Sequence, residues 1–265
     1  MKEIKQVITI VKYEIVRHVH RKRFLAIIII LFLTVILPII VRAALGIPNP
    51  ESPTDYAISA LSDISLLTIL TATFFAGDTI SSEYDKRTAH VLITNPVRRE
   101  IIYIGKFLAA VSSSLLIVIF PHIVAIVGMQ IIYQQIVDKI FLSLLYTILY
   151  VFAVISLSMF ISSIMKSSTM SIILTFFLLF MIFPVIQFVL TFSKIEPWFI
   201  ITYCEQIITL VFNPPEQRII EYHVNNAVFY QYYPDIGTSI LVLIAYLVTC
   251  LLAGIIIFKI REIKE

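Results

Sequence analysis

The chain has 265 residues, of which 59% are hydrophobic and only 14% are charged, and its formal net charge is +3 at pH 7. Soluble domains carry about 25% charged residues, so this composition excludes a water-facing globular surface. Neither the charge nor the cysteines indicate another class of protein. The positive net charge reflects membrane topology and does not indicate a nucleic-acid partner. Cys204 and Cys250 fall in an outer loop and in the last apolar window, which does not suggest a disulfide framework.

Six apolar windows predict six transmembrane helices. A helix needs about 20 apolar residues to cross a bilayer, and long unbroken apolar runs favour helices over a closed barrel. The windows are 24–41, 58–80, 107–129, 141–165, 169–192 and 236–258. Asp63 and Asp78 are the only formally charged residues in them. We therefore expect an all-α polytopic membrane protein with one transmembrane domain over residues 1–265.

The distribution of lysine and arginine predicts the orientation. Of the 20 such residues, 16 lie before the first window, in 81–106, in 166–168 or after the last window. The connections on the opposite side hold the other four, beside eight acids. Because basic residues concentrate on the cytoplasmic side, we expect both ends of the chain to be cytoplasmic and the location to be the cell membrane.

Residues 4–19 have helical spacing of their apolar positions, with basic residues elsewhere on the wheel. Such a helix is typical of the inner membrane interface, where its cations lie near lipid headgroups. His18 and His20 are two residues apart and point to different sides of a helix, so they do not indicate a metal pair. Membrane lipid is the expected contact of this segment.

Asp63 lies inside the second window, where a carboxylate at the helix centre costs about 2.5–3.5 kcal/mol. Two interpretations stay open. Asp63 either lines a transport pathway beside nearby serines, or lies at the outer rim and pairs with an arginine or a backbone amide. Asp78 lies near the inner boundary, and we expect it to act as a cap or to pair with the region of Lys86 and Arg87.

The inner connection 81–106 is long and mixed in character, as partner-binding loops of membrane proteins are. A short helix is expected over 86–94 and is stopped by Pro96, after which an amphipathic stretch re-enters the membrane at Gly105-Lys106. Val91 and Leu92 would present an apolar knob flanked by basic residues. A half-apolar helix of this kind suits docking into a groove on a soluble partner.

This segment resembles the hallmark of the membrane subunits of type-2 ABC exporters. The family pattern is a Glu, an Arg-Thr or Gly-Thr, a Leu-Leu-like pair, a Pro followed by basic residues, and a closing Gly-Lys. The matching residues here are Glu83, Arg87-Thr88, Val91-Leu92, Pro96, Arg98-Arg99 and Gly105-Lys106. The first Leu of the pair is Val91, a mild departure. The six windows and the basic N-terminal helix extend the resemblance over the whole chain.

The resemblance implies a permease that has no ATPase domain of its own. No phosphate-binding loop is present, because Gly105-Lys106 lacks the first Gly and the following Ser or Thr of that motif. ATP and Mg would then be bound by a separate ATPase subunit, with no cofactor in this chain. A second permease subunit, identical or different, would complete the pathway. The implied coupling residues are Glu83, Arg87, Val91, Leu92, Pro96 and Arg98, with Lys166 in the short 166–168 turn as a second, smaller contact.

Two later windows contain intramembrane irregularities. Pro121 precedes His122 in the third window, and Pro184 precedes Gln187 in the fifth. Prolines in spans usually produce kinks. His122 and Gln187 join Asp63 as pathway candidates, and the alternative for His122 is a hydrogen bond to a neighbouring helix.

The outer connection 193–235 predicts a short helix between Pro197 and Pro214 that lies in or dips into the outer leaflet. The tyrosines at 230–233 are interpreted as part of an aromatic belt at headgroup level, with a substrate-binding role as the alternative.

Other classes of protein are weighed against the permease. No zinc-protease or serine-hydrolase motif and no Cys/His cluster at ligand spacing occurs, so an enzyme is not expected. An ion-coupled carrier or channel usually places ionisable groups or broken helices at mid-membrane, often in repeated pairs, and this chain has one peripheral acid. A non-transporting scaffold stays open. The sequence does not identify the substrate, and export is implied by the resemblance alone.

Overall fold

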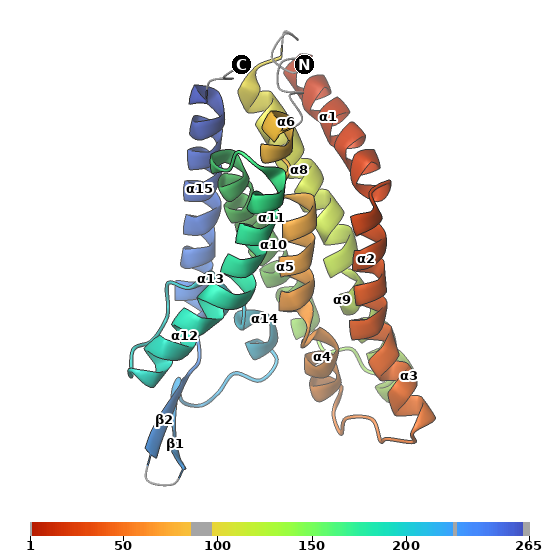
Figure 1. The fold of residues 1–265 in the computed structure, drawn as a ribbon. Coiled ribbons are helices and arrows are strands. Elements are labelled where there is room, and N and C mark those ends of the chain that lie inside the picture. Colours follow the sequence, from red (N-terminus) through yellow and green to blue (C-terminus); the bar gives the residue numbers. More distant parts are fainter. Residues whose placement is uncertain (1, 86–96, 225–226, 262–265) are drawn as a thin grey trace.

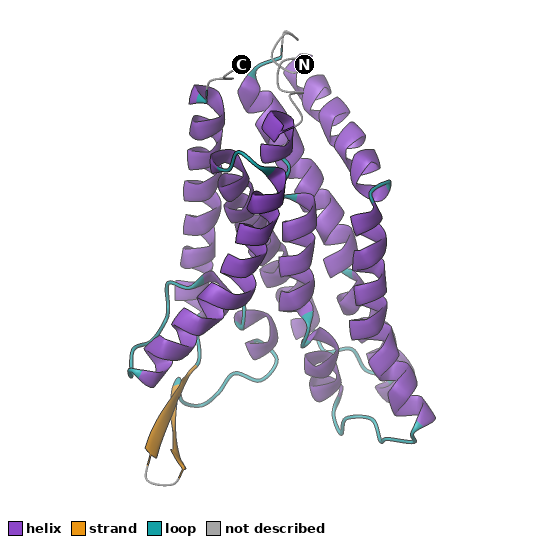
Figure 2. Ribbon diagram, viewed as in Figure 1, coloured by secondary structure: helices purple, strands orange, loops and turns teal. Residues whose placement is uncertain are grey.

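The computed structural model describes residues 2–85, 97–224 and 227–261 (Figure 1). Helices dominate these residues, and one two-stranded sheet accompanies them (Figure 2). Six of the described helices are long and apolar enough to cross a membrane, judged by length and composition. The prediction of an all-α polytopic membrane protein is confirmed.

The spanning helices run over Lys22–Ala44, Pro53–Phe75, Arg99–Tyr133, Lys139–Ile164, Ser168–Phe192 and Ile236–Ile260. In chain order the elements are α1 (Lys2–Val19), α2 (Lys22–Leu31), η1 (Phe32–Ile36), α3 (Leu37–Ala44), α4 (Pro53–Leu61), α5 (Ile64–Phe75), α6 (Ser81–Asp85), α8 (Arg99–Val118), α9 (Phe120–Tyr133), α10 (Lys139–Ile164), α11 (Ser168–Phe177), η2 (Leu178–Ile182), α12 (Phe183–Phe192), α13 (Ile201–Cys204), α14 (Ile207–Leu210), β1 (Ile219–Val224), β2 (Ala227–Tyr232) and α15 (Ile236–Ile260).

The N-terminus and the end of α15 lie at the same end of the bundle, called here the inner end (Figure 1). The 45–52 loop and the hairpin of β1 and β2 lie at the opposite end, called the outer end. Helix α10 runs through the middle and packs against α15, α8 and α5. Its residues Tyr150–Ile155 are mostly fully buried, so α10 forms the centre of the core.

Two spanning helices contain a π-helical turn shortly before a proline. The turn η1 precedes Pro38, and η2 precedes Pro184. Proline lacks an N–H and its ring clashes with the carbonyl four residues earlier, so the helix must deviate there. The third spanning helix breaks at Ile119 instead, and Pro121 falls in the first turn of α9, where its missing N–H costs little.

The second spanning helix begins earlier than its apolar window because it is capped. The Ser52 side chain accepts a hydrogen bond from the Asp55 N–H (3.1 Å), and Pro53 occupies the first turn. The helix is interrupted between α4 and α5, and Asp63 lies at this junction.

The same helix ends at Phe75, whereas the apolar window continues to residue 80. Residues 76–80 form a buried turn. Ser162 of α10 accepts hydrogen bonds from the two N–H groups at the end of this turn (3.0 Å each), and Ser171 of α11 donates to the carbonyl of Gly77. Neighbouring helices thus satisfy the polar groups that an interrupted helix exposes.

The outer connection contains two short helices and a hairpin. Helices α13 and α14 fall between Pro197 and Pro214, where one short helix was expected. Strands β1 and β2 pair antiparallel with Ile219 opposite Tyr232. The tyrosines at 230–232 therefore belong to a β-strand, and describing them only as an aromatic belt missed this element.

Candidate functional site

A cluster of buried charges joins three elements at the inner end. The Lys106 ammonium of α8 lies 2.5 Å from Glu14 Oε1 of α1 and 2.8 Å from Glu83 Oε1 of α6. Lys106 is only 2% exposed. Arg17 approaches both carboxylates at 3.3 Å. Buried charges need such partners, so the two acids and two cations fasten α1 and α6 to α8.

The electrostatics of this cluster favour the charged forms. Burial alone would raise the pKa of Glu14, but Lys106 and Arg17 hold that pKa below its ordinary value. Burial opposes the charge of Arg17, yet the carboxylates of Glu14 and Glu83 raise the Arg17 pKa. Burial lowers the pKa of neighbouring His18 to about 4, which leaves this ring neutral near pH 7.

A close backbone approach supports the cluster. A Cβ added at Gly105 would lie 2.8 Å from Ile10 Cγ2 and 2.9 Å from Ile10 Cβ. Only glycine leaves room for α1 to pack this closely on α8. The Gly105-Lys106 pair therefore serves two purposes. Gly105 lets α1 pack closely on α8, and Lys106 forms an ion pair with Glu14 of α1.

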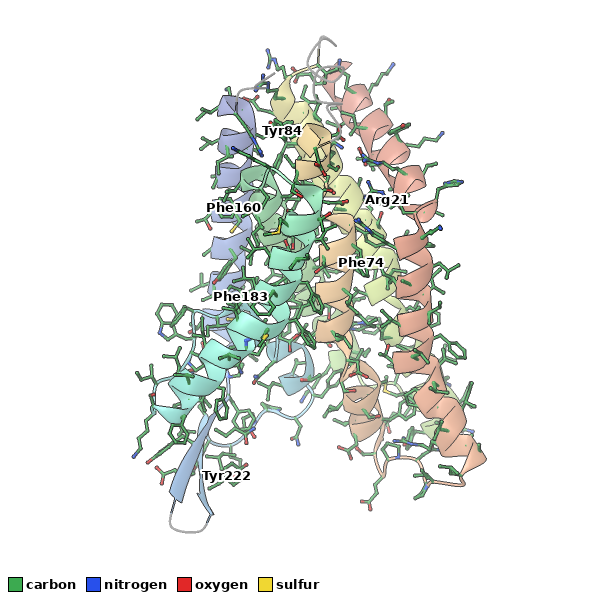
Figure 3. All side chains as sticks on the ribbon, viewed as in Figure 1. Arg21, Phe74, Tyr84, Phe160, Phe183 and Tyr222 are labelled. Atoms are coloured by element: carbon green, nitrogen blue, oxygen red, sulfur yellow. The ribbon has the colours of Figure 1, made fainter. Side chains whose placement is uncertain are left out.

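A second set of ion pairs lies beside the cluster. Asp78, in the turn after α5, pairs with Arg21 (3.2 Å) and Arg23 (2.8 Å) at the start of α2. Figure 3 labels Arg21 beside the N-terminal helices, on the side that faces α8 and α5. These partners come from the N-terminal segment, whereas the sequence suggested the region of Lys86 and Arg87, which lies outside the described residues.

The predicted coupling residues fall into three groups. Arg87, Val91, Leu92 and Pro96 lie outside the described residues, as does the helix expected over 86–94. The structure brings Glu83 together with Lys106 as described above. The remaining two are exposed: Arg98 pairs with Glu3 (3.3 Å), and Lys166 lies in the turn between α10 and α11.

The turn that carries Lys166 is linked to α6. Asp85 Oδ2 at the end of α6 accepts hydrogen bonds from the Ser168 N–H (3.3 Å) and hydroxyl (2.9 Å). The 166–168 turn and the end of α6 are therefore neighbours. This turn and the end of α6 both lie at the inner end (Figure 1).

Two arginines brace the same end. Arg99 donates to carbonyls at the end of α15, including that of Lys259 (2.9 Å). Arg261 donates to the carbonyls of Ser163 (2.7 Å) and Met165 (3.0 Å) at the end of α10. The Arg261 guanidinium also lies 4.0 Å from the ring centre of Tyr84. These contacts cap the exposed carbonyls of two helix ends and tie α15, α10 and α6 together.

The pathway candidates lie elsewhere and do not form one group. Asp63 and Gln187 line the same cavity of about 320 Å³, named here the acidic cavity. His122 is buried and lies 3.4 Å from Thr147 Oγ1 of α10, the contact with a neighbouring helix that the sequence suggested as the alternative. Sequence reasoning missed Glu205, which also lines the acidic cavity; its signal was a single acid within an apolar run.

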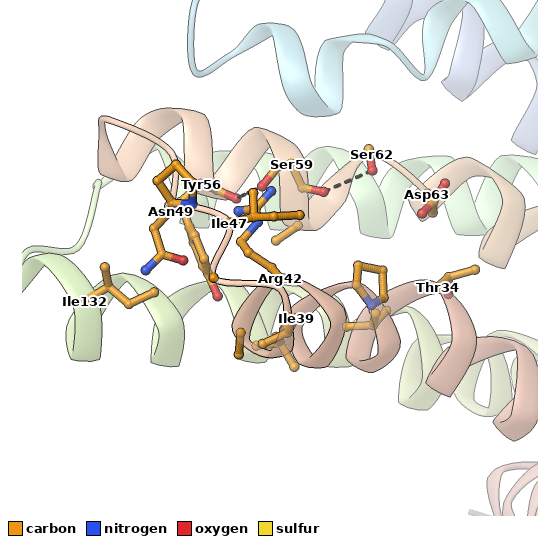
Figure 4. Close-up of a pocket in the computed structure, with 17 residues that line it drawn as sticks. Thr34, Ile39, Arg42, Ile47, Asn49, Tyr56, Ser59, Ser62, Asp63 and Ile132 are labelled. Atoms are coloured by element: carbon orange, nitrogen blue, oxygen red, sulfur yellow. Dashed lines mark hydrogen bonds between the residues drawn. The ribbon is translucent and has the colours of Figure 1, made fainter.

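Asp63 is exposed and also borders a second cavity of about 510 Å³ between α3, α4 and α9. Figure 4 shows Asp63 at one end of this cavity, with Arg42 reaching toward Tyr56 from the α3 side. Within the described residues, no group of three or more His, Cys, Asp or Glu side chains could hold a metal ion.

Comparison with protein families matched the chain over residues 8–263 to a family described as "ABC-2 family transporter protein". The comparison with curated proteins returned no match. The family match includes most of α1, all six spanning helices and the inner-end cluster. The chain therefore belongs to the ABC-2 transporter family, as a non-catalytic membrane permease subunit of an ABC transporter.

Proposed function

We propose that this permease exports its substrate with energy from a separate ATPase subunit, which binds ATP and Mg and docks on the inner end. The observation that carries the proposal is the ion pair between Glu83 and Lys106, the first and last residues of the coupling motif, together with the ion pair of Lys106 with Glu14. A partner pushing on residues 86–96 would displace α6 and α8 together. The same ion pairs would transmit that displacement to α1.

The arrangement of the inner end supports this transmission. Asp85 links α6 to the 166–168 turn, and Arg261 links α15 to α10. The coupling residues in this proposal are Glu83, Arg87, Val91, Leu92, Pro96, Arg98 and Lys166. Glu83 and Lys106 hold the motif together, Val91 and Leu92 enter a groove on the ATPase, and Lys166 makes a smaller contact.

We further propose that two permease subunits, identical or different, pair around the pathway in the cell membrane with cytoplasmic termini. The lysine and arginine bias supports this orientation, because 16 of the 20 such residues lie on the side of the termini. The termini also share one end of the bundle (Figure 1).

The test is a pull-down of the tagged full chain from its native host in mild detergent, followed by mass spectrometry. The wild-type chain is expected to bring down a stoichiometric ATPase, and Leu92→Asp is expected to lose it while still inserting in the membrane. Leu45→Asp is the matched control, because Leu45 is an exposed leucine at the outer end and should retain the partner.

When the purified ATPase is added back to the purified chain, the stimulation of ATP hydrolysis by the permease should be lower with Leu92→Asp than with the wild type. Unchanged stimulation would refute the coupling site. A clean preparation of wild-type chain without any nucleotide-binding partner would refute the ATP-driven mechanism and favour an ion-coupled carrier or a scaffold.

A further inference from the structure

We infer that the acidic cavity is a binding site for a small organic cation of the alkylammonium class. It forms where the α4–α5 junction meets η2, α12 and the segment of α13 and α14. This inference deepens the proposed function by naming a substrate class, and it rests on that function only for the statement that the bound cation is transported. A volume of about 320 Å³ is at the small end of ligand sites.

The charge of the lining favours a positive ligand. Asp63 contributes a carboxyl group from the α4–α5 junction, and Glu205 contributes another from the outer segment. Gln187 and Gln206 add carboxamide oxygens. Among the residues that the structure describes, no lysine, arginine or histidine lines the cavity, so an anion would meet two acids without a compensating cation.

Unpartnered polar atoms point to a missing ligand. Thr202 lines the cavity and is only 7% exposed, yet its hydroxyl has no hydrogen-bond partner among the described residues. Glu205 Oε2 is likewise buried without a hydrogen-bond partner there. Buried polar groups are normally paired, so each exception calls for an explanation. A bound cation would satisfy the carboxylate, and a polar group on the same ligand would satisfy the hydroxyl.

The apolar wall favours an organic cation over a metal ion. Leu66, Leu179, Phe180 and Pro184 also line the cavity. Phe180 supplies an aromatic ring, which can interact favourably with a positive group. Among the described residues no group of three or more His, Cys, Asp or Glu side chains could hold a metal ion, and a hard metal ion gains nothing from this apolar wall. An alkylammonium group uses both parts of the lining.

Such a group has two possible sources: a free small molecule, or the choline headgroup of a membrane lipid. The test uses the full-length chain in lipid nanodiscs and measures binding of radiolabelled choline without the ATPase. In phosphatidylglycerol nanodiscs the wild-type chain is expected to bind choline saturably. The neutral isostere 3,3-dimethylbutan-1-ol should not compete, because it has the same shape without the charge.

Isosteric variants locate the site. Glu205→Gln and Asp63→Asn should each weaken choline binding about tenfold or more, since each leaves the cation with one carboxylate. Glu216→Gln is the matched control: it removes an exposed acid from the same outer segment that does not line the cavity. The inference is overturned if choline does not bind saturably, if Glu205→Gln binds as well as the control, or if the neutral isostere competes equally.

Phosphatidylcholine nanodiscs distinguish the two sources. Choline binding that is lost there but present with phosphatidylglycerol identifies the lipid headgroup as the occupant. Binding that persists in both identifies a free small cation. No choline-binding experiment contains the ATPase. A negative choline-binding result would therefore not contradict the pull-down, and a negative pull-down would not contradict choline binding.

Discussion

Lys106 lies 2.5 Å from Glu14 and 2.8 Å from Glu83, in a position that is almost fully buried. Replacing it by methionine keeps much of the volume but removes the ammonium that balances two buried carboxylates. We expect Lys106→Met to lower the free energy of unfolding by about 3–5 kcal/mol. Thermal unfolding of the detergent-solubilised protein measures the change.

Lys259→Met is the matched control for that variant. Lys259 also forms an ion pair, with Glu100 at 2.8 Å, but both side chains are exposed. Exposed ion pairs contribute little to stability, so its melting temperature should stay close to that of the wild type. Equal losses in the two variants would contradict a special role for the buried cluster.

His18 predicts a pH dependence of stability. Its folded pKa is about 4, against an ordinary 6.5, because burial disfavours the charged ring. Between these values the unfolded chain binds a proton that the folded chain does not, so stability falls as the pH decreases from about 6.5 toward about 4. The full effect is about 3 kcal/mol. Glu14 and Asp78 favour the protonated ring, whereas Arg17 and Arg21 oppose it.

The corresponding measurement compares melting temperatures at pH 7.5 and pH 5.0. His18→Phe should lose less stability on acidification than the wild type, since phenylalanine does not titrate and can pack beside Phe75, whose ring centre lies 5.0 Å from that of His18. Glu14 has a lowered pKa, so its own contribution is lost only at more acidic pH. Identical losses in both proteins would assign the pH dependence to other groups.

The site was only partly predictable from single residues. The motif pointed to Glu83 and Lys106, and the structure joins them. Glu14 was missed because the basic character of residues 4–19 suggested a lipid contact for the whole helix. The sequence did hold a signal for Glu14: it lies three residues after Val11 and therefore on the same, apolar face of the helix. Glu205 was visible in the sequence, but which helix would face it depended on tertiary structure.

At the scale of elements, the contact of α1 with α8 depends on Gly105. We expect Gly105→Ala to cost about 1–3 kcal/mol and to loosen α1, because the new Cβ would overlap Ile10. Faster trypsin cleavage after the exposed Lys12, together with a lower melting temperature, would report the loosening.

A second substitution tests the reason for this loss. Ile10→Ala removes the atoms that the new Cβ would meet, so in the Gly105→Ala background it should restore α1, and the two changes should be non-additive. Gly237→Ala is the control, since its nearest contact is Asp235 Oδ2 at 3.4 Å, an ordinary distance. Additive losses would show that Gly105 and Ile10 act separately.

Apolar content predicted the existence of the spanning helices better than their ends. The turn at 76–80 stayed hidden because Ser162 and Ser171, from helices far along the chain, satisfy its polar groups. The third spanning helix begins at Arg99, eight residues before its window, because Arg99 packs on the end of α15. The hairpin had a local signal, two runs of β-branched and aromatic residues separated by Asn225-Asn226.

At the scale of the whole molecule, the two ends differ in character. The inner end is held by ion pairs and helix caps that involve α1, α6, α8, α10 and α15. Asp63 lines both cavities. The junction of α4 and α5, where Asp63 lies, is toward the outer end of the bundle (Figure 1). A displacement at the inner end would therefore move several helices as one unit, and the open space around Asp63 is where such a movement can change the shape of a binding site.

This difference depends on the direction of the chain in the membrane, which cysteine labelling tests. In a background with Cys204 and Cys250 replaced by serine, Lys5→Cys reports the inner end and Asn49→Cys the outer end, since both residues are exposed. A membrane-impermeant maleimide should label Asn49→Cys in intact cells and Lys5→Cys only after permeabilisation, because the excess of basic residues predicts a cytoplasmic inner end. Labelling of Lys5→Cys in intact cells would invert the topology and place the proposed ATPase contact on the wrong side of the membrane.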